Sequence, residues 1–339
     1  MKQWILHIII LLTVALTSCT SLVDDEPGIS KEETRVMFTL SMGESTGARA
    51  RSSELGDGYE NKIDVNNTKI VFYDEDNTLW AEVQNLSLQN GSSINLYHII
   101  GELKLMNGAD LSQAHNLKVV VLVNSGTSFD NQFSSLNNLA YNYPLGDQDY
   151  IPMWGMKSFG NIEFTPGSRT DLGTINLLRA IAKVHLTFSL FNCELTATPS
   201  FNRYNTSGAC TPEISDSMKD TPEEITDPHL PGNVAVGTDL LFRQLNENEY
   251  MLYIPEYKNI GINAENKAYV QLKMKDIRDK EYEYNIDFKH YLTNTQWDIL
   301  RNHYYKFNIV KSVSGNSDLT LEVRSEEYAG FELRPEYGD

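Results

Sequence analysis

The stretch Ala182-Lys183-Val184-His185-Leu186-Thr187-Phe188-Ser189-Leu190 alternates between apolar and polar side chains at every position. Because successive side chains of a β-strand point to opposite faces, this period of two predicts a strand with one buried face. The same alternation occurs at Val36, Phe38, Leu40 and Met42, whereas helical periodicity is scarce along the chain. The sequence therefore predicts an all-β protein.

Further short strands with turn-rich polar segments between them are expected along most of the chain. They lie at residues 69–73, 79–83, 119–123, 250–254, 268–274, 282–288, 304–310 and 319–323. Asp74-Glu75-Asp76-Asn77 joins the first two of these strands and predicts a hairpin. A single short helix is expected, with Asp130 as its cap and with Phe133, Leu136 and either Leu139 or Ala140 on one face. Regularly spaced strands with so little helix are typical of antiparallel β-sandwiches.

The chain has 339 residues, which is enough for about two domains with separate cores. The strand pattern divides it near residue 178, into an N-terminal domain at 31–178 and a C-terminal domain at 179–339. The second domain contains a long polar insertion at about 192–233, with few large apolar residues. We expect this insertion to lie on the surface.

The N-terminus has the layout of an export signal. Lys2 precedes an apolar run at residues 4–16, which is long enough for a signal sequence and short for a membrane span. The run ends in Leu16-Thr17-Ser18-Cys19, which resembles the processing site of bacterial lipoproteins. Residues 1–18 would be removed, and Cys19 would carry acyl chains such as palmitate that anchor the protein in the outer membrane. The alternative is an ordinary cleaved signal peptide with a coincidental cysteine.

Residues 19–30 would form a tether. Its acidic cluster Asp24-Asp25-Glu26 resembles the surface-export tether of Bacteroides-type lipoproteins.

Charge and cysteine content restrict the partners and the class of fold. Lys and Arg total 28 against 46 Asp and Glu, and the net charge of −18 argues against nucleic acid as a partner. Besides Cys19 the chain has only Cys193 and Cys210, too few for a disulfide-dense scaffold or a four-cysteine zinc site. These two cysteines could form one disulfide in an oxidising compartment or remain separate thiols.

We predict no catalytic residue, metal site or cofactor. Residues 43–47 match the G-x-S-x-G pattern, but the strand and helix that a nucleophile elbow needs are not predicted around them. Asp74 and Asp76 resemble the start of a calcium loop, but the required Gly and Glu are absent, so a hairpin turn is favoured. The histidines show no pair with metal-ligand spacing. Trp80, Trp154 and Trp297 are expected to be core residues.

Four short segments, spread over most of the mature chain, resemble one known family. They are Ile151-Pro152-Met153-Trp154-Gly155, Arg179-Ala180-Ile181-Ala182-Lys183-Val184, Tyr253-Ile254-Pro255-Glu256 and Arg301-Asn302-His303-Tyr304-Tyr305. In this order, after a lipoprotein signal, they resemble the Bacteroides-type fimbrillins, the FimA and Mfa-like subunits of type V pili. The resemblance implies two transthyretin-like β-sandwich domains, other fimbrial subunits as partners and a location in a surface fimbria.

The resemblance also implies how such a subunit assembles. Loss of one strand from a sandwich exposes an apolar groove, which a strand of another chain can fill. The strand at 36–42 is the candidate for removal, because a Gly- and Ser-rich stretch follows it and contains Arg49 and Arg51. In the family, Arg-specific cleavage in this loop is the maturation step. The alternative is an exposed loop that happens to contain arginines.

The candidate donor segment is the C-terminal tail. Leu319, Leu321 and Val323 alternate with polar residues there, which fits either a donated strand or the last strand of an ordinary sandwich. A host or bacterial surface ligand would be a further partner. A second function remains open, that of a surface glycan-binding lipoprotein, and it would require exposed aromatic side chains gathered on one face.

Overall fold

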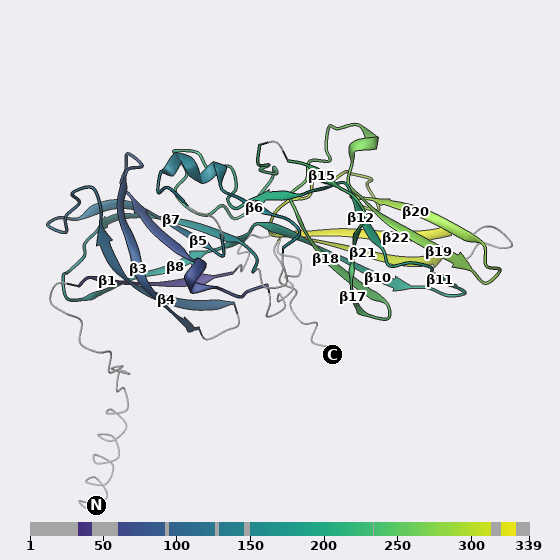
Figure 1. Ribbon diagram of the computed structural model, residues 1–339, viewed down its shortest axis with the longest axis horizontal. Helices are drawn as coiled ribbons and strands as arrows, with labels where there is room; N and C mark the ends of the chain where they lie inside the picture. Colours follow the sequence, from purple (N-terminus) through teal and green to yellow (C-terminus); the bar gives the residue numbers. More distant parts are fainter. Residues whose placement is uncertain are drawn as a thin grey trace, which may run out of the picture.

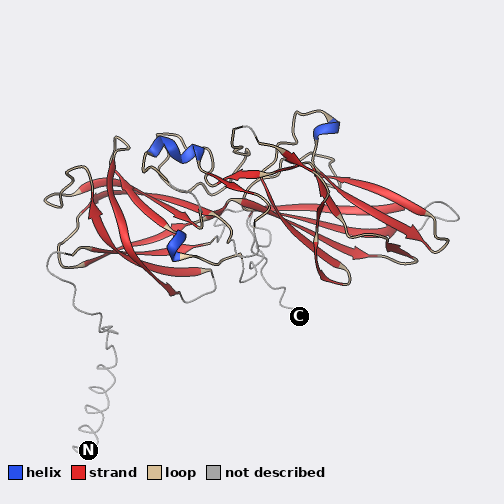
Figure 2. Ribbon diagram, viewed as in Figure 1, coloured by secondary structure: helices blue, strands red, loops and turns tan. Residues whose placement is uncertain are grey.

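The computed structural model describes residues 33–42, 60–91, 95–125, 129–145, 150–232, 234–312 and 320–329. Within these ranges almost all regular structure is β-strand (Figure 2), which confirms the predicted fold class. No helix in this part of the chain has the length and hydropathy of a membrane span. The strands form two groups that lie side by side along the long axis (Figure 1). We call residues up to Arg179 the first domain and the residues after it the second domain.

The first domain is built on one eight-stranded sheet with the order β8-β1-β4-β3-β2-β5-β7-β9. Its strands are β1 (Arg35–Ser41), β2 (Lys69–Tyr73), β3 (Leu79–Asn90), β4 (Leu96–Leu105), β5 (His115–Val123), β7 (Met153–Ile162), β8 (Arg169–Asn176) and β9 (Leu178–Arg179). The sheet folds over a core that contains Phe38, Phe72, Trp80 and Trp154. β7 reaches the end of β8 so closely that a side chain at Gly155 would collide with the Asn176 carbonyl.

Two sheets face each other in the second domain. One has the order β17-β18-β10-β21-β22, and the other has the order β11-β19-β12-β16 with β20 paired to β19. The strands of the first sheet are β10 (Ile181–Ser189), β17 (Arg243–Asn246), β18 (Glu249–Pro255), β21 (His303–Ser312) and β22 (Thr320–Ala329). Those of the second are β11 (Cys193–Leu195), β12 (Ser200–Asn202), β16 (Leu240–Leu241), β19 (Tyr269–Asp276) and β20 (Glu281–Asp287). Phe201, Phe288 and Phe307 pack between these sheets.

Two small ribbons complete the β-structure. β13 (Tyr204–Asn205) pairs with β15 (Val236–Gly237) inside the second domain. β6 (Ala140–Asn142) of the first domain pairs with β14 (Ser207–Ala209) of the second, so one ribbon crosses the boundary between the domains. The described helices are short 3₁₀ turns: η1 (Val65–Asn67), η2 (Phe133–Asn138) and η3 (Ala264–Asn266).

Each domain also contains a parallel strand pair, which the prediction of antiparallel sandwiches did not include. β1 is parallel to β8, and β10 is parallel to β21. An alternating pattern shows which side chains are buried but not the direction of the neighbouring strand. Parallel and antiparallel pairing therefore cannot be told apart from alternation alone.

Two local predictions have different outcomes. The hairpin at Asp74 is confirmed, because its carboxylate accepts hydrogen bonds from the backbone N–H groups of Asp76 and Thr78 between β2 and β3. The predicted helix is the 3₁₀ turn η2, and its cap residue is Gln132. Asp130 instead accepts bonds from Gln132 N and Ser135 Oγ, so it stabilises the approach to the turn.

Candidate functional site

β1 is an internal strand, although it is the first strand in the described part of the chain. It lies between β4, to which it is antiparallel, and β8, to which it is parallel. Backbone bonding to β1 continues past the end of β8, since Ser41 O accepts a hydrogen bond from Leu177 N at 2.7 Å. Loss of β1 would therefore open a gap inside the sheet, with unpaired backbone groups on both sides of it.

The inner face of β1 is fully buried. Val36, Phe38, Leu40 and Met42 each have 0% exposure, and the ring of Phe38 lies 6.1 Å from that of Phe72. Burial of such a side chain contributes about 1.5 to 3 kcal/mol, or roughly 6 to 12 kcal/mol for the four together. That sum is comparable with the whole stability of a typical domain, about 5 to 15 kcal/mol. An empty groove would therefore cost the first domain a large part of its stability, and a strand that fills it would restore that stability.

The residues on either side of β1 fall outside the described structure. Cys19 lies before it, and Arg49 and Arg51 lie in residues 43–59. The chain re-enters the described structure at Glu60, whose side chain is fully buried. Glu60 forms an ion pair with Lys183 of β10 at 2.9 Å, and Tyr253 of β18 donates a hydrogen bond to the same carboxylate. The point at which the chain resumes is thus fixed to the second domain.

The four segments that carry the family resemblance meet at the domain boundary. β7 pairs with β9 through Met153 and Arg179, which joins the first two segments. Arg179 also donates to the side-chain oxygen of Asn302 at 3.2 Å, which adds the fourth. These residues build the joint between the domains.

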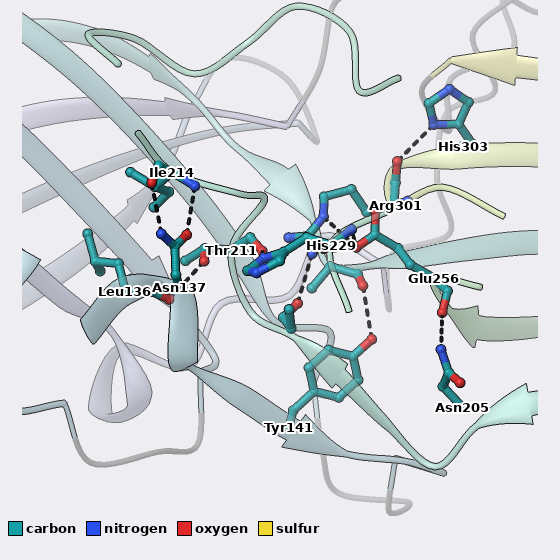
Figure 3. A network of polar contacts seen from close by, with 12 residues as sticks. Leu136, Asn137, Tyr141, Asn205, Thr211, Ile214, His229, Glu256, Arg301 and His303 are labelled. Atoms are coloured by element: carbon teal, nitrogen blue, oxygen red, sulfur yellow. Dashed lines mark hydrogen bonds and ion pairs between the residues drawn. The ribbon is translucent and has the colours of Figure 1, made fainter. Parts of the chain in front are cut away.

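The third and fourth segments are joined by a buried ion pair (Figure 3). Arg301 Nη2 lies 2.6 Å from Glu256 Oε2, and both side chains are almost fully buried. Arg301 Nη2 also donates to Ala209 O at 3.1 Å, and Asn205 Nδ2 donates to Glu256 O at 2.7 Å. His229 donates through Nδ1 to Thr211 O. The ion pair therefore holds the backbone of the polar insertion in place.

Part of that insertion crosses the boundary and packs on the first domain. We call residues 207–225 the strap. Thr211 Oγ1 donates to Leu136 O at 2.9 Å, and Asn137 and Ile214 exchange two hydrogen bonds beside it (Figure 3). Ile214 and Ile225 are buried. The prediction that the whole insertion lies on the surface is therefore wrong for the strap, whose isolated apolar residues were the only sequence signal of its burial.

β10 is the counterpart of β1 in the second domain. It too is the first strand, lies between an antiparallel and a parallel neighbour, and buries Val184, Leu186 and Phe188 on one face. Only Ala180 separates it from β9. β1 is followed instead by residues 43–59, which contain two arginines. Of these two equivalent strands, β1 is the one followed closely by arginines that a trypsin-like protease can recognise.

The C-terminal strand β22 is an edge strand of its own sheet. It pairs with β21 along its whole length, and Leu321 and Val323 are partly buried against the core. Leu319 lies outside the described residues. In the described structure Leu321 and Val323 therefore lie in a strand that pairs within the chain's own sheet.

The end of β22 nearest the first domain carries a perturbed carboxyl group. Burial, together with the charges of Glu224 and Asp298, raises the pKa of Glu327 to about 7. Its strand neighbour Tyr305 donates a hydrogen bond to Asp298 O at 2.8 Å and accepts one from Leu300 N. Burial lowers the pKa of the nearby His303, whose Nδ1 donates to Arg301 O. This end of β22 is therefore sensitive to pH.

Cys193 and Cys210 do not form a disulfide with each other. Cys193 lies in β11 opposite Asp276, whereas Cys210 is buried in the strap, where its thiol donates to Ser125 O at 3.8 Å. Burial raises the pKa of the Cys210 thiol to about 12, so it is a poor nucleophile. The alternative of two separate cysteines is the one that the structure has.

The described residues contain no group of His, Cys, Asp and Glu side chains able to hold a metal ion. Trp80 and Trp154 are buried, and Trp297 packs against the core, as expected. Phe191 and Tyr291 are the aromatic side chains with large exposure in the described ranges. They do not make the aromatic cluster that a glycan-binding face would need.

Comparison with known proteins supports the fold. No protein-family model and no curated protein matches the chain. Among solved structures, the tip fimbrial protein Mfa3 of Porphyromonas gingivalis, with a C-terminal truncation, is similar with a TM-score of 0.53 at 12% identity. The match covers 88% of this chain and 99% of that one.

Two structures from Parabacteroides distasonis are similar in the same way. A putative cell adhesion protein has a TM-score of 0.53 at 13% identity, over 89% of this chain and 99% of that one. A fimbrial assembly protein has a TM-score of 0.51 at 14% identity, over 85% and 98%. The resemblance to fimbrial proteins inferred from the sequence is confirmed for the fold of the chain.

Proposed function

We propose that this chain is a structural and adhesive subunit of a bacterial surface fimbria, assembled by exchange of a strand in its first domain. The observation that carries the proposal is the place of β1. It is an internal strand with a fully buried apolar face, and it is followed by a segment with two arginines. The fold shared with a tip fimbrial protein and a fimbrial assembly protein supports the same function.

The first step is export and lipid attachment. The signal sequence is removed and Cys19 carries acyl chains that hold the protein at the outer membrane. While β1 remains in its sheet, the groove is full and the subunit has no site for a neighbour. The lipoprotein is therefore a precursor that does not assemble.

Cleavage after Arg49 or Arg51 then separates β1 from the rest of the chain. The new N-terminal segment of the remaining chain is held in place from Glu60 onward, because the Glu60 side chain contacts Lys183 and Tyr253 of the second domain. Departure of β1 exposes the apolar groove between β4 and β8. A strand of another subunit that fills it restores the lost burial and the backbone hydrogen bonds. Head-to-tail repetition of this contact makes a filament.

The incoming strand is proposed to come from the C-terminal tail of another subunit. For Leu319, Leu321 and Val323 to be donated, β22 would have to leave β21, with which it pairs over ten residues. A subunit whose β22 stays in place would accept a strand without giving this one, as at the tip or the anchor of a fimbria.

The test is mass spectrometry of the protein taken from the cell surface as monomer and as polymer. We expect an acylated Cys19 at the N-terminus of the monomer and an N-terminus at Ala50 or Ser52 in the polymer. A polymer made of chains that still contain residues 35–41 would show that β1 is not exchanged.

A further inference from the structure

β8 depends on β1 more than any other strand of the first domain does. It is the terminal strand of its sheet, and β1 is its one strand partner. Most of its side chains are exposed, and only Leu172 and Ile175 are buried. If β1 leaves, as the proposed function requires, β8 loses its ladder of backbone hydrogen bonds. One wall of the empty groove would then be free to move.

In the second domain, an additional strand supports the strand that runs parallel to β10, and the sheet of the first domain has no equivalent of it among the described residues. The strand parallel to β10 is β21, and β21 is held on its far side by β22. β8 has no such strand beyond it. In the described structure β8 also contacts β7, where Lys157 Nζ donates to Thr174 O at 2.9 Å, and one residue of the strap, Thr221.

Thr221 bridges β7 and β8. Its backbone N–H donates to Met156 O at 2.7 Å, and its hydroxyl accepts a hydrogen bond from Met156 N at 2.7 Å. The hydroxyl oxygen lies 2.8 Å from Asn176 O and 3.0 Å from Met156 O, and it has one proton to donate. Because Met156 O already accepts from the Thr221 amide, Asn176 O is the better acceptor. The Thr221 side chain thus ties the end of β8 to β7.

The strap residues just before Thr221 are also fastened to the first domain, to Ser158 of β7 and to Lys118 of β5. Asp220 accepts a hydrogen bond from Ser158 N at 3.0 Å, and Ser158 Oγ donates to Lys219 O at 2.6 Å. Lys118 Nζ donates to Asp216 O at 2.7 Å. At the strap's other end, Ala209 O is held by the buried Arg301. None of these contacts involves β1, so they persist when β1 is absent.

We infer that Thr221 is a positioning residue, through which the second domain keeps β8 in place while the groove is empty. The inference rests on the proposed function, since it concerns the interval between the loss of β1 and the arrival of another strand. The second domain then does more than extend the subunit, because it preserves the acceptor site of the first.

The experiment replaces residues 44–51 of the full mature chain with a site for a sequence-specific protease, so that cutting does not depend on the native arginines. Hydrogen exchange of the β8 amides is measured in the uncut protein and after cutting and removal of the β1 peptide. Rebinding of a fluorescent peptide of residues 33–42 is measured in parallel. The proteins compared are the wild type, Thr221→Val, Thr221→Ser and, as a control just after the strap, Thr226→Val, whose hydroxyl donates a hydrogen bond to Asp227.

In the uncut protein we expect similar β8 exchange for all four. After removal of β1, Thr221→Val should raise β8 exchange and weaken peptide binding by about three- to ten-fold, the value of one hydrogen bond. Thr221→Ser and Thr226→Val should behave like the wild type.

Equal exchange and binding in all four cut proteins would overturn the inference. So would faster exchange in uncut Thr221→Val, which would make the contact a general structural one, or complete loss of β8 protection in the cut wild type. Native cleavage at Arg49 or Arg51 is scored separately, so failure of the proposed function is distinguishable.

Discussion

Glu256 and Arg301 are 45 residues apart in the sequence and form an ion pair with 2% and 0% side-chain exposure at the boundary between the two domains. Glu256 also accepts a hydrogen bond from the backbone N–H of Arg301, and Arg301 holds the carbonyl of Ala209 in the strap. One buried pair thus fixes the end of β18, the start of β21 and the strap.

Breaking this pair should destabilise the protein strongly. Glu256→Gln leaves the Arg301 guanidinium buried without a counter-charge, and the expected loss in the free energy of unfolding is about 3 to 5 kcal/mol. Glu322→Gln is the matched control, because Glu322 forms an exposed ion pair with Arg324, and a loss below about 1 kcal/mol is expected there. Urea unfolding of both variants measures the difference. Equal losses would mean that the buried ion pair contributes no more to the free energy of unfolding than the exposed one.

Removal of both arginines after β1 should stop assembly and leave the fold intact. In the double variant Arg49→Ala, Arg51→Ala, β1 stays covalently linked and its apolar face stays in the groove. We expect a monomer with the wild-type melting temperature and no high-mass ladder on gels of surface extracts. Ladders from the double variant would show that cleavage at these arginines is not the trigger.

Membrane attachment should depend on Cys19. Acyl chains contribute about 0.8 kcal/mol for each buried methylene, and the described residues offer no membrane-spanning helix as a substitute. Cys19→Ala should therefore move the protein from the membrane fraction to the soluble fraction. Wild-type amounts of the variant in the membrane fraction would contradict lipid anchoring at this residue.

The role of β22 can be tested with a charge on its inner face. If Leu321 remains in its own sheet, Leu321→Asp should lower the stability of the monomer by roughly 1 to 3 kcal/mol, because the side chain is half-buried against the core. Thr320→Asp, at an exposed position of the same strand, is the control. Thermal unfolding is run beside an assembly assay. A stable Leu321→Asp monomer that cannot assemble would instead indicate that the strand is donated.

Stability should depend on pH through Glu327. Its pKa in the folded protein is about 7, above the ordinary 4.5, so the folded state holds this proton more tightly than the unfolded chain. The contribution is fully present below about pH 4.5 and is lost as the pH rises to about 7, by at most about 3 kcal/mol. Glu327→Gln should remove this slope, and the exposed Glu322→Gln should keep it.

The measurement is the melting temperature from pH 4.5 to 8.5. His303 has a lowered pKa and gives a slope of opposite sign below its ordinary value, so the diagnostic quantity is the difference between the wild type and Glu327→Gln. Parallel curves for the two proteins would mean that Glu327 does not titrate in this range.

The sequence was sufficient to predict the strands whose apolar and polar residues alternate clearly, but not β4, β7 or β8. Val184, Leu186 and Phe188 lie on the buried face of β10, and the apolar residues of β1 are likewise all buried. The sequence did not reveal that both strands have a parallel neighbour or that β1 is internal. Those features depend on pairing between residues such as Leu40 and Ile175, which are distant in the chain. Nothing in the sequence around either residue identifies the other as its partner.

Only part of the joint between the domains could be predicted from the sequence. The segments around Arg179, Glu256 and Arg301 stood out as similar to a family, but their spacing does not say that the side chains meet. The strap was missed because polar composition indicates exposure only on average. Thr221, Asp220 and Lys219 are typical surface residues, and their hydrogen bonds to β7 and β8 depend on the fold of the other domain.

The mixed pairing of β1 has a consequence for the symmetry of a filament. A strand that replaces β1 meets β8 on one side, where hydrogen bonds are slanted and evenly spaced, and β4 on the other, where they are perpendicular and come in pairs. Only a strand running in the direction of β1 matches both patterns. Every subunit joined in this way must point in the same direction, so the two ends of the filament are chemically different. One end presents an empty groove and the other an unused strand, and growth by this contact is possible only where the two can meet.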